Sequence, residues 1–143
     1  MYRISTRGQY ALLIMEDLAK EDSQKYVPLK LLSHRRNLSE KYLEQILIHL
    51  GKAGLVTGTR GINGCYKLTK PASDYTAGEI LRAMEGDISP QSPGSETSKT
   101  FVSEGSKKFW SDFEKAINDY VDSVALDEIA KKSAEFTGYE YCI

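Results

Sequence analysis

The sequence has few cysteines and no long apolar run, and both shortages narrow what the chain can be. Its 143 residues include only Cys65 and Cys142, too few for a disulfide framework, so we expect reduced thiols in a cytoplasmic protein. Apolar runs are short, as in residues 11–15, whereas a membrane span needs roughly 18 residues. No apolar signal region follows residues 1–5, so we expect no export. Neither a membrane protein nor a disulfide-rich secreted domain is expected.

Signatures of catalysis are also missing from the sequence. No glycine-rich phosphate loop follows a predicted strand, and no pattern places paired carboxylates in an apolar pocket or a cysteine beside a histidine. Hydrophobic residues make up 41% of the chain and charged residues 27%, as in an ordinary globular domain rather than a disordered chain or a coiled-coil rod. We therefore expect a globular protein of about one domain's length that is not an enzyme.

The formal net charge of −1 hides an asymmetry along the chain. Residues 1–85 carry thirteen Lys/Arg against nine Asp/Glu, a balance of +4, whereas residues 86–143 carry six against eleven, a balance of −5. Within the first part, residues 25–70 hold nine basic residues and two acidic ones, a balance of +7. Such a basic block in a nearly neutral protein is typical of a surface that binds a polyanion. A solvated lysine-rich face gives the same composition, so charge alone leaves both interpretations open.

Hydrophobic periodicity predicts two helices in the first quarter of the chain. Residues 8–19 place apolar side chains at three- and four-residue intervals, and Ser5 or Thr6 stands where an N-cap belongs. A short second helix is expected to begin at Pro28 and end near Asn37. Proline suits a first helical turn because the N–H that it lacks would be unsatisfied there.

A third helix is predicted over residues 40–52, with Ser39 as its N-cap. At 100° per residue, four apolar side chains share one side, which we expect to enter the core. They are Leu43, Ile46, Leu47 and Leu50. The opposite side, within about 60°, is formed by Lys41, Gln45, Ile48 and Lys52. This side presents two cations, an amide and a branched apolar group.

Two short β-favouring runs follow and predict a hairpin. They are residues 55–57 and 65–69, and the turn between them, residues 58–64, contains three glycines and an asparagine. Helix, helix, turn, helix and hairpin are the layout of a winged helix-turn-helix. Arg60 stands at the hairpin tip, where a wing would meet a narrow DNA groove. The predicted fold class is therefore mainly α, a winged helix-turn-helix with a small β-hairpin wing.

The rest of the chain predicts a fourth helix, a loop and a long last helix. Thr76 and Glu79 have the spacing of a capping box and start a helix over residues 77–84. Residues 86–106 are rich in Pro, Gly, Ser and Thr and predict a flexible loop. Residues 107–143 are expected to form a long helix, ending near residue 124, and a C-terminal tail. The DNA-binding domain would then be residues 1–85.

The long helix carries a broad apolar stripe. Its members are Phe109, Trp110, Phe113, Ile117, Tyr120, Val121 and Val124. The stripe is larger than one winged domain of this size needs, which favours a homodimer interface. Packing of the helix back onto its own domain is the alternative.

Six motifs together resemble one family of regulators. They are residues 4–11, 38–45, 52–56, 59–61, 64–66 and 77–86. The motifs are long, stand in the right order and cover essentially the whole chain, so the sequence resembles the Rrf2 family of bacterial transcription regulators. The resemblance implies a homodimeric winged-helix repressor that binds palindromic promoter DNA, with long C-terminal helices crossing between the subunits.

The resemblance also implies which residues contact double-stranded DNA. In the family, the start and exposed face of the third helix read the major groove, and a wing arginine enters the minor groove. The corresponding residues are Ser39, Lys41, Tyr42, Glu44, Gln45 and Arg60. Glutamine pairs with adenine, lysine with guanine or phosphate, and glutamate accepts from the cytosine amino group. Periodicity places Lys41 and Gln45 outward independently of the resemblance.

One departure from the family concerns cofactors. Many members bind an iron–sulfur cluster through three cysteines in the loop after the fourth helix. Residues 87–108 contain neither Cys nor His, so we expect no cluster, no other metal and no cofactor. Cys65 stands where the family usually has a glycine, either as a tolerated small side chain or as a redox sensor.

Without a cluster, the sequence resembles the subgroup of repressors that control cysteine and sulfur metabolism together with cysteine synthase. Cysteine synthase holds partner tails that end in isoleucine, and the chain ends in Tyr141, Cys142 and Ile143. A free carboxylate and a branched apolar side chain make a compact recognition unit. The alternatives are an ordinary tail and a regulator that senses another small molecule or a thiol-redox signal.

Overall fold

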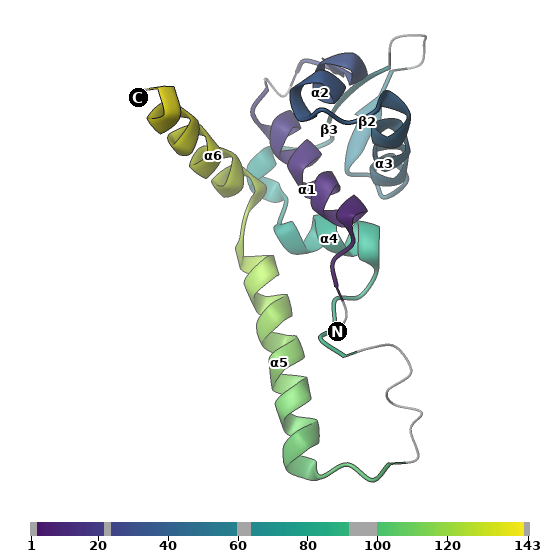
Figure 1. The fold of residues 1–143 in the computed structure, drawn as a ribbon, viewed down its shortest axis with the longest axis vertical. Coiled ribbons are helices and arrows are strands. Elements are labelled where there is room, and N and C mark those ends of the chain that lie inside the picture. The colour runs from purple at the N-terminus through teal and green to yellow at the C-terminus, as the bar shows by residue number, and fades with distance from the viewer. Residues whose placement is uncertain (1–2, 22–23, 60–63, 92–99, 142–143) are drawn as a thin grey trace.

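The structure is a computed structural model of the chain that describes residues 3–21, 24–59, 64–91 and 100–141 (Figure 1). These residues form six α-helices, a short 3-10 helix and a three-stranded sheet. The elements are α1 (Thr6–Ala19), β1 (Val27–Pro28), α2 (Leu29–Arg36), α3 (Glu40–Lys52), β2 (Val56–Gly58), β3 (Cys65–Leu68), η1 (Ala72–Asp74), α4 (Ala77–Glu85), α5 (Glu104–Ser123) and α6 (Leu126–Tyr141). The mainly helical fold class with a winged helix-turn-helix is confirmed.

The helix-turn-helix packs around one apolar core. Ser5 caps α1 and Ser39 caps α3, because each hydroxyl accepts a hydrogen bond from a backbone N–H three residues on, at 3.1 and 3.2 Å. The side of α3 expected to enter the core is fully buried, as predicted: Leu43, Ile46, Leu47 and Leu50 are each 0% exposed. Burial of four aliphatic side chains, at roughly 1.5–3 kcal/mol each, fixes the rotation of α3 about its own axis.

The sheet contains the predicted hairpin and one strand that sequence reasoning missed. β3 is central, with β2 and β1 antiparallel on either side of it. β1 pairs Val27 with Tyr66 and Pro28 with Cys65. Pro28 therefore ends β1 and precedes α2 instead of forming its first turn. The backbone N–H of Leu29 donates to the carbonyl of Gly64 at 2.9 Å, so α2 begins against the base of the wing.

The second half of the chain differs from expectation at two places. α5 begins at Glu104, inside the segment 86–106 that was predicted as a loop, because the Ser103 hydroxyl accepts from the Ser106 N–H at 3.2 Å and caps the helix there. The residues after 124, predicted as a tail, form α6 instead. Thr76 caps α4 as predicted, but the Glu79 carboxylate pairs with Lys70 at 3.0 Å and leaves the capping box half complete.

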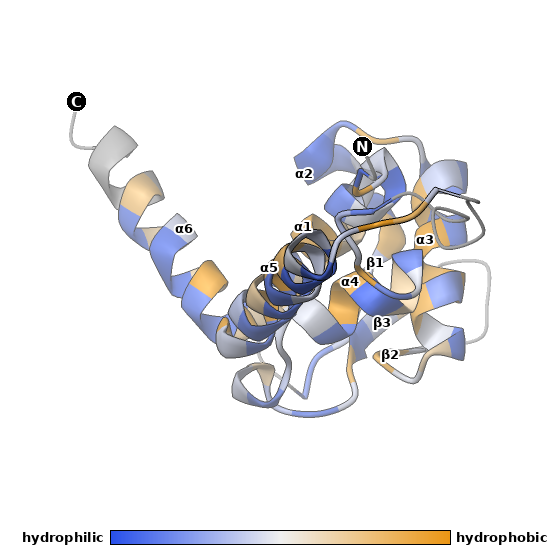
Figure 2. Ribbon diagram, turned by 90° about the horizontal axis from the view of Figure 1, so that it is seen from below, coloured by the Kyte–Doolittle hydropathy of each residue, from blue (hydrophilic) through white to orange (hydrophobic). Residues whose placement is uncertain are grey.

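Helices α5 and α6 extend away from the helix-turn-helix (Figure 1). In Figure 1, α5 projects below the body and α6 leaves it on the upper left; in Figure 2, where α5 is seen nearly end-on, α6 again points away from the body. Leu126 and Ala130, 0% and 8% exposed, lie in the first turns of α6, which contacts α1 and η1. In the described part of the chain, no helix has the length and apolarity that a membrane crossing requires.

A polar cluster fixes α5 against α4. The Arg82 guanidinium donates to both carboxylate oxygens of Asp122, at 2.7 and 2.9 Å, and to the Asn118 side chain at 2.8 Å. These hydrogen bonds raise the pKa of Arg82 and lower the pKa of Asp122. The helices approach closely at Gly78, where an added Cβ would lie 2.2 Å from an Asp122 oxygen. A side chain at position 78 would therefore displace the Asp122 carboxylate from its place beside Arg82.

Candidate nucleic-acid interface

The outward side of α3 is the centre of the candidate interface. All four residues predicted to face outward, Lys41, Gln45, Ile48 and Lys52, are exposed, because the opposite side of the helix is buried in the core. The predicted orientation of Lys41 and Gln45 is therefore confirmed. An exposed helical face with hydrogen-bonding side chains fits the width of a B-DNA major groove, about 12 Å.

The other three residues expected on α3 have different surroundings. Glu44 is exposed. The Ser39 hydroxyl is engaged as the helix cap, where it accepts from the Tyr42 N–H. The Tyr42 ring is half-buried and packs edge-on against Tyr10 of α1, with ring centroids 6.0 Å apart. Ser39 and Tyr42 thus also hold the first turn of α3 in place.

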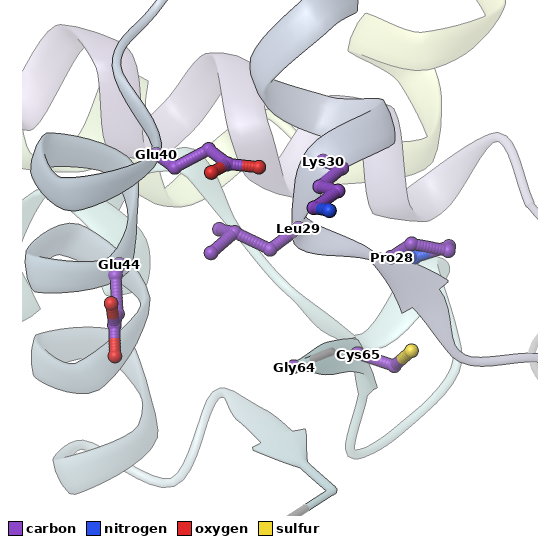
Figure 3. Close-up of a pocket in the computed structure, with 7 residues that line it drawn as sticks. All are labelled: Pro28, Leu29, Lys30, Glu40, Glu44, Gly64 and Cys65. Atoms are coloured by element: carbon purple, nitrogen blue, oxygen red, sulfur yellow. The ribbon is translucent and has the colours of Figure 1, made fainter. Parts of the chain in front are cut away.

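A recess joins the start of α3 to the base of the wing (Figure 3). It has a volume of about 430 Å³ and is lined by Pro28, Leu29, Lys30, Glu40, Glu44, Gly64 and Cys65. Burial raises the pKa of the Tyr66 phenol, and the negative charge of the neighbouring Glu44 carboxylate raises it further. Glu44 of α3 and Tyr66 of β3 are therefore close enough to interact electrostatically. The α3 face and the wing base therefore form one surface.

Part of the basic block is neutralised inside the molecule. Arg36 donates from Nε to the carboxylate of Asp17 at 2.6 Å, and its second nitrogen completes a two-point pair with the same carboxylate. Asp17 is only 3% exposed, and its hydrogen bond raises the pKa of Arg36. Arg35 pairs with Glu21 at 2.9 Å, as Lys70 does with Glu79. These three cations hold elements together and leave little positive charge for a ligand.

Five lysines of the block carry no ion pair within the described ranges: Lys25, Lys30, Lys41, Lys52 and Lys67. Lys67 is half-buried, with its ammonium 4.7 Å from the centre of the Tyr26 ring, and the other four are exposed. Lys41 and Lys52 lie on the outward side of α3, and Lys30 lines the recess. Sequence reasoning did not single out Lys30 as a site residue, because only the β1–β3 pairing brings the start of α2 to the wing.

Some expected site residues lie outside the described residues. The hairpin is paired up to Thr59, whose N–H donates to the Cys65 carbonyl at 3.0 Å, but Arg60 at the tip is not described. At the C-terminus, Tyr141 ends α6, and Cys142 and Ile143 are not described. The roles of Arg60 and of the tail therefore stay predictions.

The apolar stripe of α5 divides into two parts. Phe109, Phe113 and Tyr120 are 57%, 41% and 69% exposed. The Phe109 ring also contacts Trp110, with centroids 5.1 Å apart, so the start of α5 carries an open aromatic cluster. The remaining members, Ile117, Val121 and Val124, are half-buried, and Val121 lies against Gly78 of α4 in the same chain. The last part of the stripe therefore packs back onto its own domain, which was the expected alternative, and the first part is left exposed.

The three-helix unit, the hairpin wing and the exposed face of α3 define the class as winged helix-turn-helix transcription regulators. The family model described as "Rrf2: Iron-dependent Transcriptional regulator" matches residues 4–132. CymR of Bacillus subtilis (strain 168), an HTH-type transcriptional regulator, is 38% identical over 130 residues, which are 90% of this chain and 89% of that protein. The chain therefore belongs to the Rrf2 family of DNA-binding transcription regulators.

Solved structures agree with this assignment. The structure of CymR, described as the global cysteine regulator of B. subtilis, has a TM-score of 0.79 at 36% identity and covers 92% of this chain and 98% of that one. The IscR of T. potens has a TM-score of 0.74 at 34% identity, with 98% and 96% covered. The likeness spans α5 and α6 as well as the helix-turn-helix.

The family description names iron, but the loop that would hold an iron–sulfur cluster lacks the residues to bind one. The loop in which the family resemblance places the cluster, residues 87–108, has neither Cys nor His in its sequence. Among the residues that the structure describes, no three His, Cys, Asp or Glu side chains are grouped so as to hold a metal ion. Thiolate ligation at this loop is therefore not possible.

Proposed function

We propose that the chain is a homodimeric repressor that acts by occupying palindromic promoter DNA. The observation that carries the proposal is the outward side of α3, where Lys41, Gln45 and Lys52 are exposed and the lysines have no ion pair within the described ranges. Two subunits would place their α3 helices in successive major grooves, about 34 Å apart. Binding there excludes RNA polymerase without any catalytic step.

Each contact residue has a chemical role in this proposal. Gln45 pairs with adenine, Lys41 with guanine or phosphate, and Glu44 accepts from a cytosine amino group. Lys30 and Lys52 contact phosphates at the two ends of the α3 surface. Arg60 enters the minor groove beside the wing, where a narrow groove concentrates negative potential.

The exposed aromatic cluster of α5 supports the homodimer. Phe109, Phe113 and Tyr120 would lose their exposed area against the same helix of a second subunit. Because Arg82 binds Asp122, a dimer formed through α5 would fix the distance between the two α3 helices through α4.

We propose further that the regulated genes serve cysteine metabolism in the cytoplasm and that cysteine synthase binds the tail of residues 141–143. B. subtilis CymR is described as a global cysteine regulator, and its likeness to this chain supports the proposal. The alternative is a regulator of the same family that senses another small molecule or a thiol-redox signal, for which Cys65 beside the recess is the candidate residue.

The DNA-binding proposal is tested by titrating the protein with a DNA duplex that it has selected from a random library, at several salt concentrations. The logarithm of affinity should fall with the logarithm of salt at a slope of about −0.9 for each phosphate contacted. Arg60→Ala should weaken binding, most of all for A·T-rich minor grooves, whereas Lys131→Ala on the exposed part of α6 should not. A salt slope near zero would refute the proposal, and an unchanged affinity of Arg60→Ala would refute the wing contact.

The partner proposal is tested by deleting residues 142–143. The truncated protein should lose binding to cysteine synthase and keep its own DNA affinity. Addition of O-acetylserine, the substrate of the synthase, should dissociate the complex that the full-length protein forms with the synthase. The substrate and the tail would compete for one carboxylate site. Retained complex formation by the truncated protein would refute the tail as the contact.

A further inference from the structure

Ile48 is an apolar residue at the centre of an otherwise polar surface. Its side chain is 47% exposed, and it lies on the outward side of α3 between Gln45 and Lys52. The core does not need it, because α3 already buries four aliphatic residues completely. A β-branched residue also gains nothing from an exposed helical position, where lysine or glutamine has the better helix propensity.

The major groove offers one apolar group, the 5-methyl of thymine. The polar groups of the major groove are hydrogen-bond donors and acceptors. An isoleucine placed against one of them would remove its hydrogen bond to water without providing another. Resting on the proposed DNA-binding function, we propose that Ile48 is a specificity residue that selects thymine by contact with its methyl group. The preferred DNA then has an A·T pair at that position in each half-site.

The position of Ile48 relative to Gln45 locates this thymine. The two residues are three positions apart, about 4.5 Å along the helix axis. Base pairs are stacked about 3.4 Å apart. Ile48 therefore lies over a base pair one or two steps from the adenine that Gln45 pairs with, and the two residues together read a short A·T-containing step.

The experiment removes the methyl group from the DNA and its partner from the protein. A DNA duplex is first selected from a random library by the full-length wild-type protein. Each thymine of the selected duplex is then replaced in turn by deoxyuridine, which lacks only the methyl, and affinities are measured for the wild-type chain, Ile48→Ala and Leu31→Ala. Leu31 is a matched control, an aliphatic residue 38% exposed on α2.

For the wild-type protein and for Leu31→Ala, the replacement of one particular thymine in either half-site should weaken binding roughly fourfold. This is the factor that corresponds to the burial of one carbon group, about 0.8 kcal/mol. Ile48→Ala should bind the thymine duplex more weakly than the wild-type protein by at least that factor. Its affinity should not change when the same thymine is replaced by deoxyuridine. Equal thermal midpoints of the three proteins would show that folding is unchanged.

Two outcomes would overturn the inference and are distinguishable from failure of the proposed function. In the first, the wild-type protein enriches a sequence but is indifferent to every deoxyuridine. In the second, Ile48→Ala keeps the wild-type pattern of sensitivity. If the wild-type protein enriches no sequence and its affinity is independent of salt, the proposed function itself fails, and the thymine contact fails with it.

Discussion

Arg36 and Lys41 belong to the same basic segment, but the structure gives them different roles. Arg36 forms a two-point pair with Asp17, which is 3% exposed, and so links α2 to α1. Lys41 is exposed on α3 and has no ion pair within the described ranges. Replacement of each by methionine removes the charge and keeps most of the unbranched apolar part of the side chain. Arg36→Met should therefore change the stability of the fold, whereas Lys41→Met should change the binding of DNA.

Arg36→Met should lower the free energy of unfolding by about 2–4 kcal/mol, since it leaves a buried carboxylate without its partner. For a chain of this size that is a fall of roughly 6–12 °C in the thermal midpoint. Lys41→Met should change stability by less than about 0.5 kcal/mol. On DNA, Lys41→Met should reduce the salt slope by about 0.9 for each phosphate that the lysine neutralises in the wild-type complex, whereas Arg36→Met should leave the slope unchanged.

Stability is measured by thermal and urea unfolding followed by circular dichroism, and DNA binding by fluorescence anisotropy at several salt concentrations. A double variant, Asp17→Leu with Arg36→Met, replaces the pair by apolar side chains and should recover most of the stability that Arg36→Met alone removes. A reduced salt slope for Arg36→Met, with stability unchanged, would refute the assignment of Arg36 to the fold.

Three further predictions concern α4 and α5. Gly78→Ala should destabilise the fold by about 1–3 kcal/mol in urea unfolding, because its Cβ would lie 2.2 Å from an Asp122 oxygen, whereas Gly105→Ala, whose Cβ meets nothing within 4 Å, should stabilise by about 0.5–1 kcal/mol; equal effects would contradict the close approach. The hydrogen bonds from Arg82 lower the pKa of Asp122, so their stabilisation is present above the ordinary pKa of about 3.9 and disappears as the pH falls through the lower folded value; Asp122→Asn should remove this part of the acid dependence of the thermal midpoint, and an unchanged acid profile would contradict the assignment. If the proposed dimer forms through α5, Phe113→Glu should run as a monomer in light scattering after gel filtration where the wild-type protein runs as a dimer, and a dimeric variant would show that the α5 cluster is not the interface.

The sequence predicted the elements whose signals are local. Residues 40–52 matched α3 at both ends, because a serine cap and a regular apolar spacing stand next to each other in the chain. The outward orientation of Lys41 and Gln45 followed from the same spacing. The sequence could not show that Arg36 is paired, since Asp17 is nineteen residues away and the two meet only when α1 packs against α2.

Elements that depend on tertiary contacts were missed. β1 has only two residues, too few for an alternating pattern, and exists because β3 pairs with it. The sequence predicts a tail in place of α6, because the residues seen to be buried among positions 126–136, Leu126 and Ala130, lie in the first turns and give too short an apolar repeat to indicate a helix. The recess lined by Lys30 could not be predicted from helix or strand periodicity, because α2, α3 and β3 form it together.

The base preference of Gln45→Ala tests most directly whether the outward side of α3 reads DNA. Affinities of the wild-type and variant proteins would be measured for every single-base substitution of the selected duplex. The account predicts that discrimination falls by about 1–3 kcal/mol at one symmetric pair of positions and is unchanged at all others. A variant with the wild-type preference at every position, or with a uniform loss of affinity and no change in preference, would contradict it.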